Sequence, residues 1–265
     1  MRLGWFLLLL FAVVPLWAAE ETANPADPDR VLRLSQAAIG QPLPDLTLRD
    51  QRGIPLALAS LRGKPVLLQL VYTSCYHTCS VATRSLASTV AKARAVFGQD
   101  GFHVLTVGFD TRVDTPQAMD YFARQQGVSD PGWHFLSGSA EQMQELMQGI
   151  GFTAFPSPKG FDHLAQVTVV DAQGVIYRQV YGETIPTPRL VEPLKELILG
   201  VAPAQESSMD LLVRRVRFFC TTYDPGDDAY RTDYSLFVGI GIGALCIFSV
   251  VFFLFREIRR NKTFS

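Results

Sequence analysis

The feature that most constrains this chain is an uncharged run of 21 residues near its C-terminus, from Ser235 to Phe255. A helix rises about 1.5 Å per residue, so this run is long enough to cross a hydrocarbon core of about 30 Å. The tail at 256–265 is basic, which predicts that it stays in the cytoplasm. We therefore expect a transmembrane helix at 235–255 that holds an exported domain at the membrane.

The N-terminus supports the same orientation. Residues 1–19 contain Arg2, an almost unbroken apolar run, and then Ala18 and Ala19, which is the pattern of a secretory signal peptide. A retained N-terminal anchor is the alternative. Both interpretations export the segment 20–234, in which we expect a polar tether at 20–40 and a juxtamembrane linker at 201–234.

The charge balance excludes one class of partner. The chain has 24 Lys and Arg residues against 25 Asp and Glu, giving a net charge of -1 with 48% hydrophobic residues. Such a composition is not that of a disordered chain or of a basic protein that neutralises phosphates. We expect no nucleic-acid partner.

Residues 41–200 alternate between strand and helix patterns. The apolar run at 66–72 has the length and character of a strand covered on both faces. The full set of predicted elements is strands at 66–72, 102–109, 133–136, 164–170 and 175–181, and helices at 82–97, 116–126, 139–149 and 187–199. The strands at 164–170 and 175–181 are separated by a turn and form a predicted hairpin. This order predicts an α/β fold, a mixed sheet flanked by helices.

Two of the four cysteines fall at a chemically useful position. Cys75 and Cys79 lie at the turn between a buried strand and a helix start, where free backbone amides and the helix dipole stabilise a thiolate. A spacing of four on a first helical turn places their Cβ atoms about 5 to 6 Å apart. Two such sulfurs either close a disulfide or share one metal ion. A purely stabilising disulfide is the weaker reading, because so short a loop constrains the unfolded chain little.

The other two cysteines are less informative. Cys246 lies inside the predicted span, and we interpret it as an apolar packing residue. Cys220 lies just outside the membrane and is either a packing thiol or an auxiliary thiol that faces a membrane-bound partner.

A soft-metal site needs a third donor, and the chain has four histidines. His163 is the best candidate, because it directly precedes the strand at 164–170, which can lie beside the carboxyl end of the strand at 66–72. His77 lies between the two cysteines but points to a different helix face. His103 and His134 belong to strands, where a core or surface role is more common.

Three motifs carry a resemblance to a known family. The segment VYTSCYHTC (71–79) resembles the Phe-x-Tyr-Thr-x-Cys-Pro-x-x-Cys segment of the Sco/SenC proteins, with Tyr76 at the place of the proline. VGFDTRVDTP (107–116) is similar to their Asp-Pro-x-x-Asp-Thr-Pro stretch, and DHLAQVTVVDAQG (162–174) to their histidine-containing strand. The resemblance covers residues 40–200 in the right order.

The resemblance implies a thioredoxin-like copper chaperone for the assembly of cytochrome c oxidase. It places two thiolate ligands on Cys75 and Cys79 and a histidine ligand on His163, around copper as Cu(I) or Cu(II). The implied partner is the copper-accepting subunit of the oxidase, and the implied role is that of a metallochaperone rather than an enzyme. Together with the membrane signals, it predicts a protein of the bacterial inner membrane, with a single C-terminal span and its functional domain in the periplasm.

Two alternatives stay open. Zinc also accepts two cysteines and one histidine with an open fourth position. An exported thiol-disulfide oxidoreductase would instead use one of Cys75 and Cys79 to attack a partner's disulfide and the other to resolve the mixed disulfide. Redox enzymes of thioredoxin type use a CxxC spacing, which is one residue shorter than the spacing here.

Overall fold

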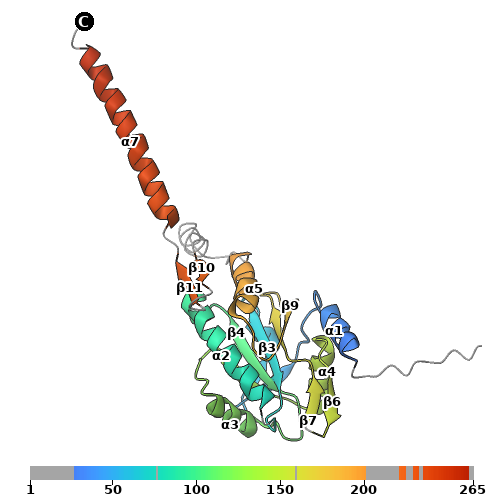
Figure 1. Cartoon of the computed structure of the whole chain (residues 1–265). Helices are drawn as coiled ribbons and strands as arrows, with labels where there is room; N and C mark the ends of the chain where they lie inside the picture. Colours follow the sequence, from blue (N-terminus) through green and yellow to red (C-terminus); the bar gives the residue numbers. More distant parts are fainter. Residues whose placement is uncertain are drawn as a thin grey trace, which may run out of the picture.

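A computed structural model describes residues 27–75, 77–158, 160–200, 221–224, 229–232 and 235–262 (Figure 1). The helices are α1 (Pro28–Ala37), α2 (Thr78–Phe97), α3 (Pro116–Gln126), α4 (Ala140–Gly149), α5 (Thr187–Gly200) and α7 (Ser235–Lys262), with a 3-10 turn η1 (Leu58–Leu61). The strands are β1 (Thr47–Asp50), β2 (Pro55–Ala57), β3 (Val66–Val71), β4 (His103–Gly108), β5 (Trp133–Ser137), β6 (Ala154–Ser157), β7 (Gly160–His163), β8 (Gln166–Val170), β9 (Ile176–Tyr181), β10 (Thr221–Asp224) and β11 (Ala229–Thr232).

A mixed sheet forms the centre of the domain. Its strand order is β2-β1-β5-β4-β3-β8-β9. Strands β3, β4 and β5 are parallel, whereas β1, β8 and β9 pair antiparallel with their neighbours. Helix α2 contacts α3 and α5, and the end of α4 accepts a hydrogen bond from Gln179 of β9 through the carbonyl of Ile150. The expected mixed α/β sheet with flanking helices is confirmed.

The central strands explain why the sequence forms this sheet. All six residues of β3 are buried, because helices cover the middle of a parallel sheet on both faces. Leu67, Leu105 and Phe135, one from each parallel strand, are at most 1% exposed. The core therefore lies around β3, β4 and β5, and it holds the carboxyl ends of these strands in fixed positions.

The pairing of β8 with β3 matters most for function. The two strands run antiparallel, with Gln69 opposite Val167. The start of β8 therefore lies beside the carboxyl end of β3, as the sequence predicted for the strand that follows His163. The predicted hairpin at 164–181 is also confirmed, as β8 and β9.

The segment expected to be a polar tether contains a helix. Helix α1 begins after Asp27, whose side chain accepts a hydrogen bond from the Asp29 amide, and it has a proline in its first turn. Its inner face is small, since only Val31 and Ser35 are buried. That face still joins the domain, because the Ser35 hydroxyl donates to Gln166 at 2.9 Å. One short buried face on a polar segment gives too weak a periodicity to recognise in the sequence.

A second hairpin, which was not predicted, precedes β8. Strands β6 and β7 pair antiparallel from Ala154 opposite His163 to Ser157 opposite Gly160. Gly160 has φ +118, a conformation that favours glycine. His163 is therefore the last residue of a strand rather than a loop residue before one. Strands β1 and β2, at one edge of the sheet, were also not anticipated.

The C-terminal helix α7 extends away from the sheet domain (Figure 1). Within the part of the chain that the structure describes, no helix combines the length and apolar character required for a membrane span. The predicted signal peptide at 1–19 and Cys220 lie outside the described residues.

Candidate functional site

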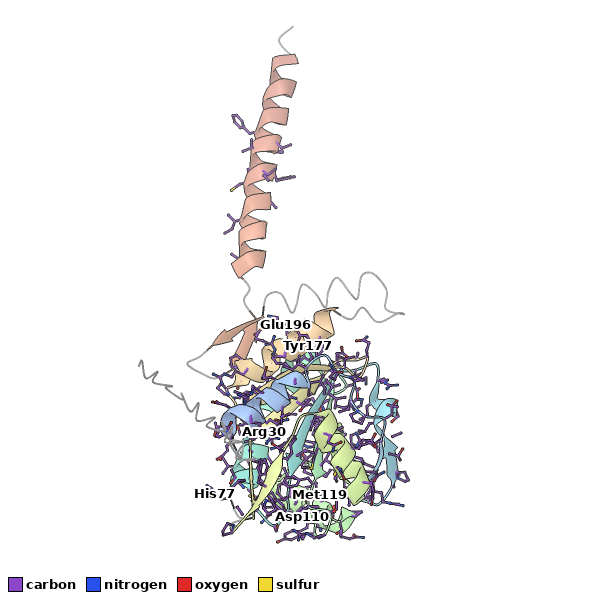
Figure 2. All side chains as sticks on the ribbon, turned by 90° about the vertical axis from the view of Figure 1, so that its right-hand side faces the viewer. Arg30, His77, Asp110, Met119, Tyr177 and Glu196 are labelled. Atoms are coloured by element: carbon purple, nitrogen blue, oxygen red, sulfur yellow. The ribbon has the colours of Figure 1, made fainter. Side chains whose placement is uncertain are left out.

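The candidate site lies at the end of the sheet where β3 and β4 finish. In Figure 2, His77 and Asp110 lie at this end of the domain, whereas Tyr177 and Glu196 lie at the other end, nearer α7. His77 precedes α2, and Asp110 follows β4 by two residues. Ligand sites in open α/β sheets occupy such strand ends.

The two cysteines meet at the start of α2. Cys75 lies before the helix, and Cys79 is its second residue, so the pair does not share a helical turn as expected. The amide of Cys79 donates a hydrogen bond to Cys75 Sγ at 3.4 Å, which brings the two residues into contact. Both thiols are free. Cys79 is 3% exposed, and Cys75 is half-buried.

The environment separates the acidities of these thiols. Burial alone would raise the pKa of Cys75, but hydrogen bonds from the Cys79 amide, the Tyr72 hydroxyl and the His77 amide outweigh it and lower the pKa to about 7. Burial raises the pKa of Cys79, and the neighbouring Cys75 raises it further. Cys75 is thus partly ionised at neutral pH, while Cys79 holds its proton until a cation or a bond replaces it.

A buried carboxylate holds the start of the cysteine loop. Asp114 Oδ1 accepts hydrogen bonds from the Thr73 amide at 2.8 Å and the Thr73 hydroxyl at 2.6 Å, and Oδ2 accepts from the Asp110 amide at 2.8 Å. The carboxylate packs so close to β4 that a Cβ at Gly108 would lie 2.5 Å from the Asp114 Cβ. Asp114 therefore ties the loop after β3 to the loop after β4.

Tyr72 joins the cysteine loop to the β6–β7 hairpin. Its ring packs edge-on against Phe109, Phe161 and His163, with centroid separations between 5.3 and 6.1 Å. Its hydroxyl lies against the hairpin backbone, because a Cβ at Gly160 would be 2.7 Å from that oxygen. Burial and the contact with Cys75 raise the pKa of Tyr72 to about 12, so the hydroxyl keeps its proton and donates.

His163 lies in an aromatic pocket at the end of β7. Its ring centroid is 5.3 Å from that of Phe152 and 5.9 Å from that of Phe109. Burial lowers the pKa of His163, and a hydrogen bond with the Leu164 backbone offsets this only in part. Its Nδ1 is buried and has no hydrogen-bond partner among the described residues. A neutral imidazole with an unpaired buried nitrogen is suited to accept a metal ion.

One small cavity connects the imidazole to Cys79. His163 and Cys79 both line it, with Gln69 and Gly182 on other walls, and its volume is about 20 Å³. A space of this size holds about one water-sized group.

The donor residues are close but do not form a finished centre. In the described parts of the chain, no group of three or more His, Cys, Asp or Glu side chains is arranged to hold a metal ion. The fold joins Cys75 to Cys79, and Cys79 to His163 through the cavity. Two sulfur donors and one neutral imidazole fit a soft metal chemically.

The side chains of the remaining histidines take no part in the site. His77 is exposed and precedes α2 without a capping hydrogen bond from its side chain. His103 and His134 lie near the amino ends of β4 and β5, away from the cysteines. Sequence reasoning missed Tyr72 and Asp114 as positioning residues, although the paired aspartates of VGFDTRVDTP were a usable signal for Asp114.

Comparison with known proteins gives a consistent result. The sequence matches the SCO1/SenC protein family over residues 36–199. It is 32% identical over 148 residues to the mitochondrial SCO2 homolog of Bos taurus, covering 56% of this chain and 53% of that protein. This chain therefore spans about half the length of that relative.

Two solved structures show the same fold. BsSco, a member of the Sco family of cytochrome c oxidase assembly proteins, matches with a TM-score of 0.54 and 20% identity, over 60% of this chain and 94% of that one. Arabidopsis thaliana ScoI, solved with copper bound, matches with a TM-score of 0.51 and 18% identity, over 60% of this chain and 97% of that one. The thioredoxin-like fold expected from the sequence is confirmed. Since the family match extends over more than half of its residues, the chain belongs to the SCO1/SenC family.

Proposed function

We propose that this protein binds copper through Cys75, Cys79 and His163 and delivers it to the copper-accepting subunit of cytochrome c oxidase during assembly. The observation that carries the proposal is the small cavity that His163 and Cys79 both line. The His163 imidazole there has a buried, unpaired nitrogen, and Cys79 is the partner of Cys75, whose pKa is lowered to about 7. Copper bound to the related Arabidopsis protein, and the role of the Sco family in oxidase assembly, support the choice of cargo and partner.

The three donors differ in the oxidation state of copper that they favour and in their ionisation. Thiolates prefer Cu(I), and an imidazole adds affinity for Cu(II), so this set can hold copper in both oxidation states. Cys75 is half-exposed and partly ionised, which makes it the first sulfur to meet incoming copper. Cys79 must lose its proton as copper binds, so binding releases protons and weakens as the pH falls.

The difference in exposure between the donors also sets the order in which they release copper. The exposed Cys75 is the donor that a partner's thiolates can displace first, while Cys79 and His163 retain the ion from inside. Movement of the β6–β7 hairpin away from Tyr72 would then withdraw His163, leaving Cys79 as the last ligand. A site without a fourth protein ligand keeps the exchange open to a partner.

We also propose that the C-terminal segment anchors the domain. In the full sequence, residues 235–255 carry no charge, and the described side chains of α7 include exposed Ile242, Phe248 and Phe252. Exposed apolar side chains along a helix suit a lipid environment. His77, beside the cysteines, lies at the end of the domain away from α7 (Figure 2). An anchor at α7 would therefore let the copper site project from a bacterial inner membrane into the periplasm. Removal of residues 235–265 should release the protein from carbonate-washed membranes.

The copper proposal is tested on the full chain, purified anaerobically with its thiols reduced. We expect one copper per chain by mass spectrometry, with a thiolate-to-copper charge-transfer band. His163→Ala should lose Cu(II) at least tenfold more than it loses Cu(I), because only the imidazole favours the divalent ion. His77→Ala is the matched control, since this exposed histidine lies beside the cysteines, and it should bind both ions normally. Absence of stoichiometric copper from the reduced protein would contradict the proposal.

A thiol-disulfide oxidoreductase is the second candidate. It is favoured by the pairing of a half-exposed thiol of pKa about 7 with a buried thiol in contact, which is the arrangement of an attacking and a resolving cysteine. Reduction of a partner disulfide at an undiminished rate by His163→Ala, with no copper bound by the parent protein, would favour this function over copper delivery.

A further inference from the structure

A second pair of histidines lies near the other end of the parallel strands. His103 is the first residue of β4, and His134 is the second residue of β5. Leu105 pairs with His134 across the two strands, and His103 is two residues before Leu105, so both histidines point to the same face of the sheet. Their ring centroids are 6.1 Å apart. We infer that His103 and His134 form a second metal site, which binds one divalent late transition-metal ion.

The separation of the rings fits a shared ion. With metal–nitrogen bonds of about 2.1 Å, two imidazole centroids lie roughly 6.4 Å apart in a trans arrangement and roughly 5.2 Å apart in a tetrahedral one. The observed 6.1 Å falls between these limits. The ring planes are inclined by 42°. The separation of the two rings is therefore compatible with one nitrogen of each ring binding the same ion.

Both rings offer lone pairs at neutral pH. Burial lowers the pKa of His103 to about 4, with Lys64 and His134 adding to the effect, and burial also lowers the pKa of His134. His103 Nδ1 is buried and has no hydrogen-bond partner in the described structure. A buried nitrogen of this kind is costly unless something occupies it, so it is a second indication of a ligand.

Charges of both signs surround the pair. The charged groups that act on the pair are Lys64, Arg94 and Asp100 at His103, and Asp50, Arg52 and Asp130 at His134. Arg94 is paired with Asp130 at 2.8 Å, and Arg52 with Asp50 at 3.1 Å. At His103 the cations Lys64 and Arg94 act more strongly than Asp100, whereas at His134 the carboxylates of Asp50 and Asp130 oppose Arg52. A cation between the rings is therefore disfavoured by the charges around His103 and favoured by those around His134.

The chemistry of the pair selects a different metal from the cysteine site. Two imidazoles without sulfur suit Cu(II), Ni(II) and Zn(II), with Cu(II) bound most tightly, whereas Cu(I) prefers thiolates. No third protein ligand is available among the described residues, so water completes the coordination shell. This site lies outside the proposed copper-delivery centre, and its failure or success leaves that proposal unaffected.

The test uses Cu(II) chloride alone with the full chain in detergent, carrying Cys75→Ser, Cys79→Ser and His163→Gln to remove the thiol centre. We expect one Cu(II) per chain by titration calorimetry, and an electron paramagnetic resonance spectrum with coupling to two nitrogens. Adding His134→Gln or His103→Gln should weaken binding at least tenfold and remove the two-nitrogen pattern. His77→Gln, which changes an exposed histidine, should leave both measurements unchanged.

A second measurement needs no substitution. Zn(II) added to the unmodified chain should protect His134 from diethyl pyrocarbonate at least tenfold, as read by peptide mass spectrometry, while exposed His77 stays reactive. Binding of Cu(II) that is equal with and without His103 and His134, or the absence of both Cu(II) binding and Zn(II) protection, would overturn the inference.

Discussion

Asp114→Ala should loosen the cysteine loop and destabilise the domain. Asp114 is 2% exposed and accepts from the Thr73 amide, the Thr73 hydroxyl and the Asp110 amide. The Thr73 hydroxyl can turn to water, because this residue is only half-buried. The two backbone amides lose their acceptor, and at about 1 to 3 kcal/mol for each buried unsatisfied group the expected loss is about 2 to 6 kcal/mol.

Asp114→Asn separates the two halves of this network. Its amide oxygen can still accept both bonds from Thr73, because these share one carboxylate oxygen, but its amide nitrogen then faces the Asp110 N–H. Burial raises the pKa of Asp114, so a neutral side chain also recovers part of the cost of burying a charge. We expect a loss of about 1 to 3 kcal/mol, from one unsatisfied amide. The loss of stability should therefore be larger for Asp114→Ala than for Asp114→Asn.

The assay is urea unfolding at pH 7, followed through the fluorescence of buried Trp133, with amide hydrogen exchange at Thr73 as the local readout. Asp120→Asn is the matched control, because this exposed carboxylate pairs with Arg124 one helical turn away, and it should cost about 0.5 kcal/mol or less. If Asp114→Ala costs no more stability than this control, or leaves amide exchange at Thr73 unchanged, the hydrogen bonds to Asp114 do not hold the cysteine loop.

Four further predictions concern the site and the core. Alkylation of Cys75 should reach half its maximal rate near pH 7 and fall below that pH, while Cys79 stays unreactive until strongly alkaline pH; equal titration of both thiols would contradict the assigned environments. Because the pKa of Cys75 lies below its ordinary value, the folded state should also gain stability as the pH rises from about 7 toward 9. His163→Leu should raise the melting temperature of the metal-free protein and stabilise it by about 1 kcal/mol or more, since it removes a buried unpaired nitrogen; a loss of stability instead would mean that the hydrogen bond of the imidazole with the Leu164 backbone outweighs that cost. Asp130→Asn should cost about 3 to 5 kcal/mol in urea unfolding, because it leaves the 3%-exposed Arg94 side chain without its carboxylate, and a loss below 1 kcal/mol would refute this.

Local patterns in the sequence were sufficient to predict most of the sheet. The apolar run of β3 indicates a strand buried on both faces. The spacing of apolar residues in α2 indicates its buried face, because a helix repeats that face every 3.6 residues. Helix α1 and the β6–β7 hairpin were missed because prediction from the sequence depends on such repeats. Each has too few buried residues to establish a period, and each is held by contacts from distant parts of the chain, such as Ser35 with Gln166.

By itself, the sequence determined that a cysteine pair follows a buried strand and precedes a helix, and that this context favours thiolates. The tertiary structure alone decided that Cys75 lies outside the helix, that Tyr72 joins its loop to the hairpin, and that His163 shares a cavity with Cys79. The physical reason is that these contacts depend on the antiparallel pairing of β8 with β3, and that pairing is set by core packing between segments far apart in the chain. Residue periodicity records which side of an element is buried, and not which distant element buries it.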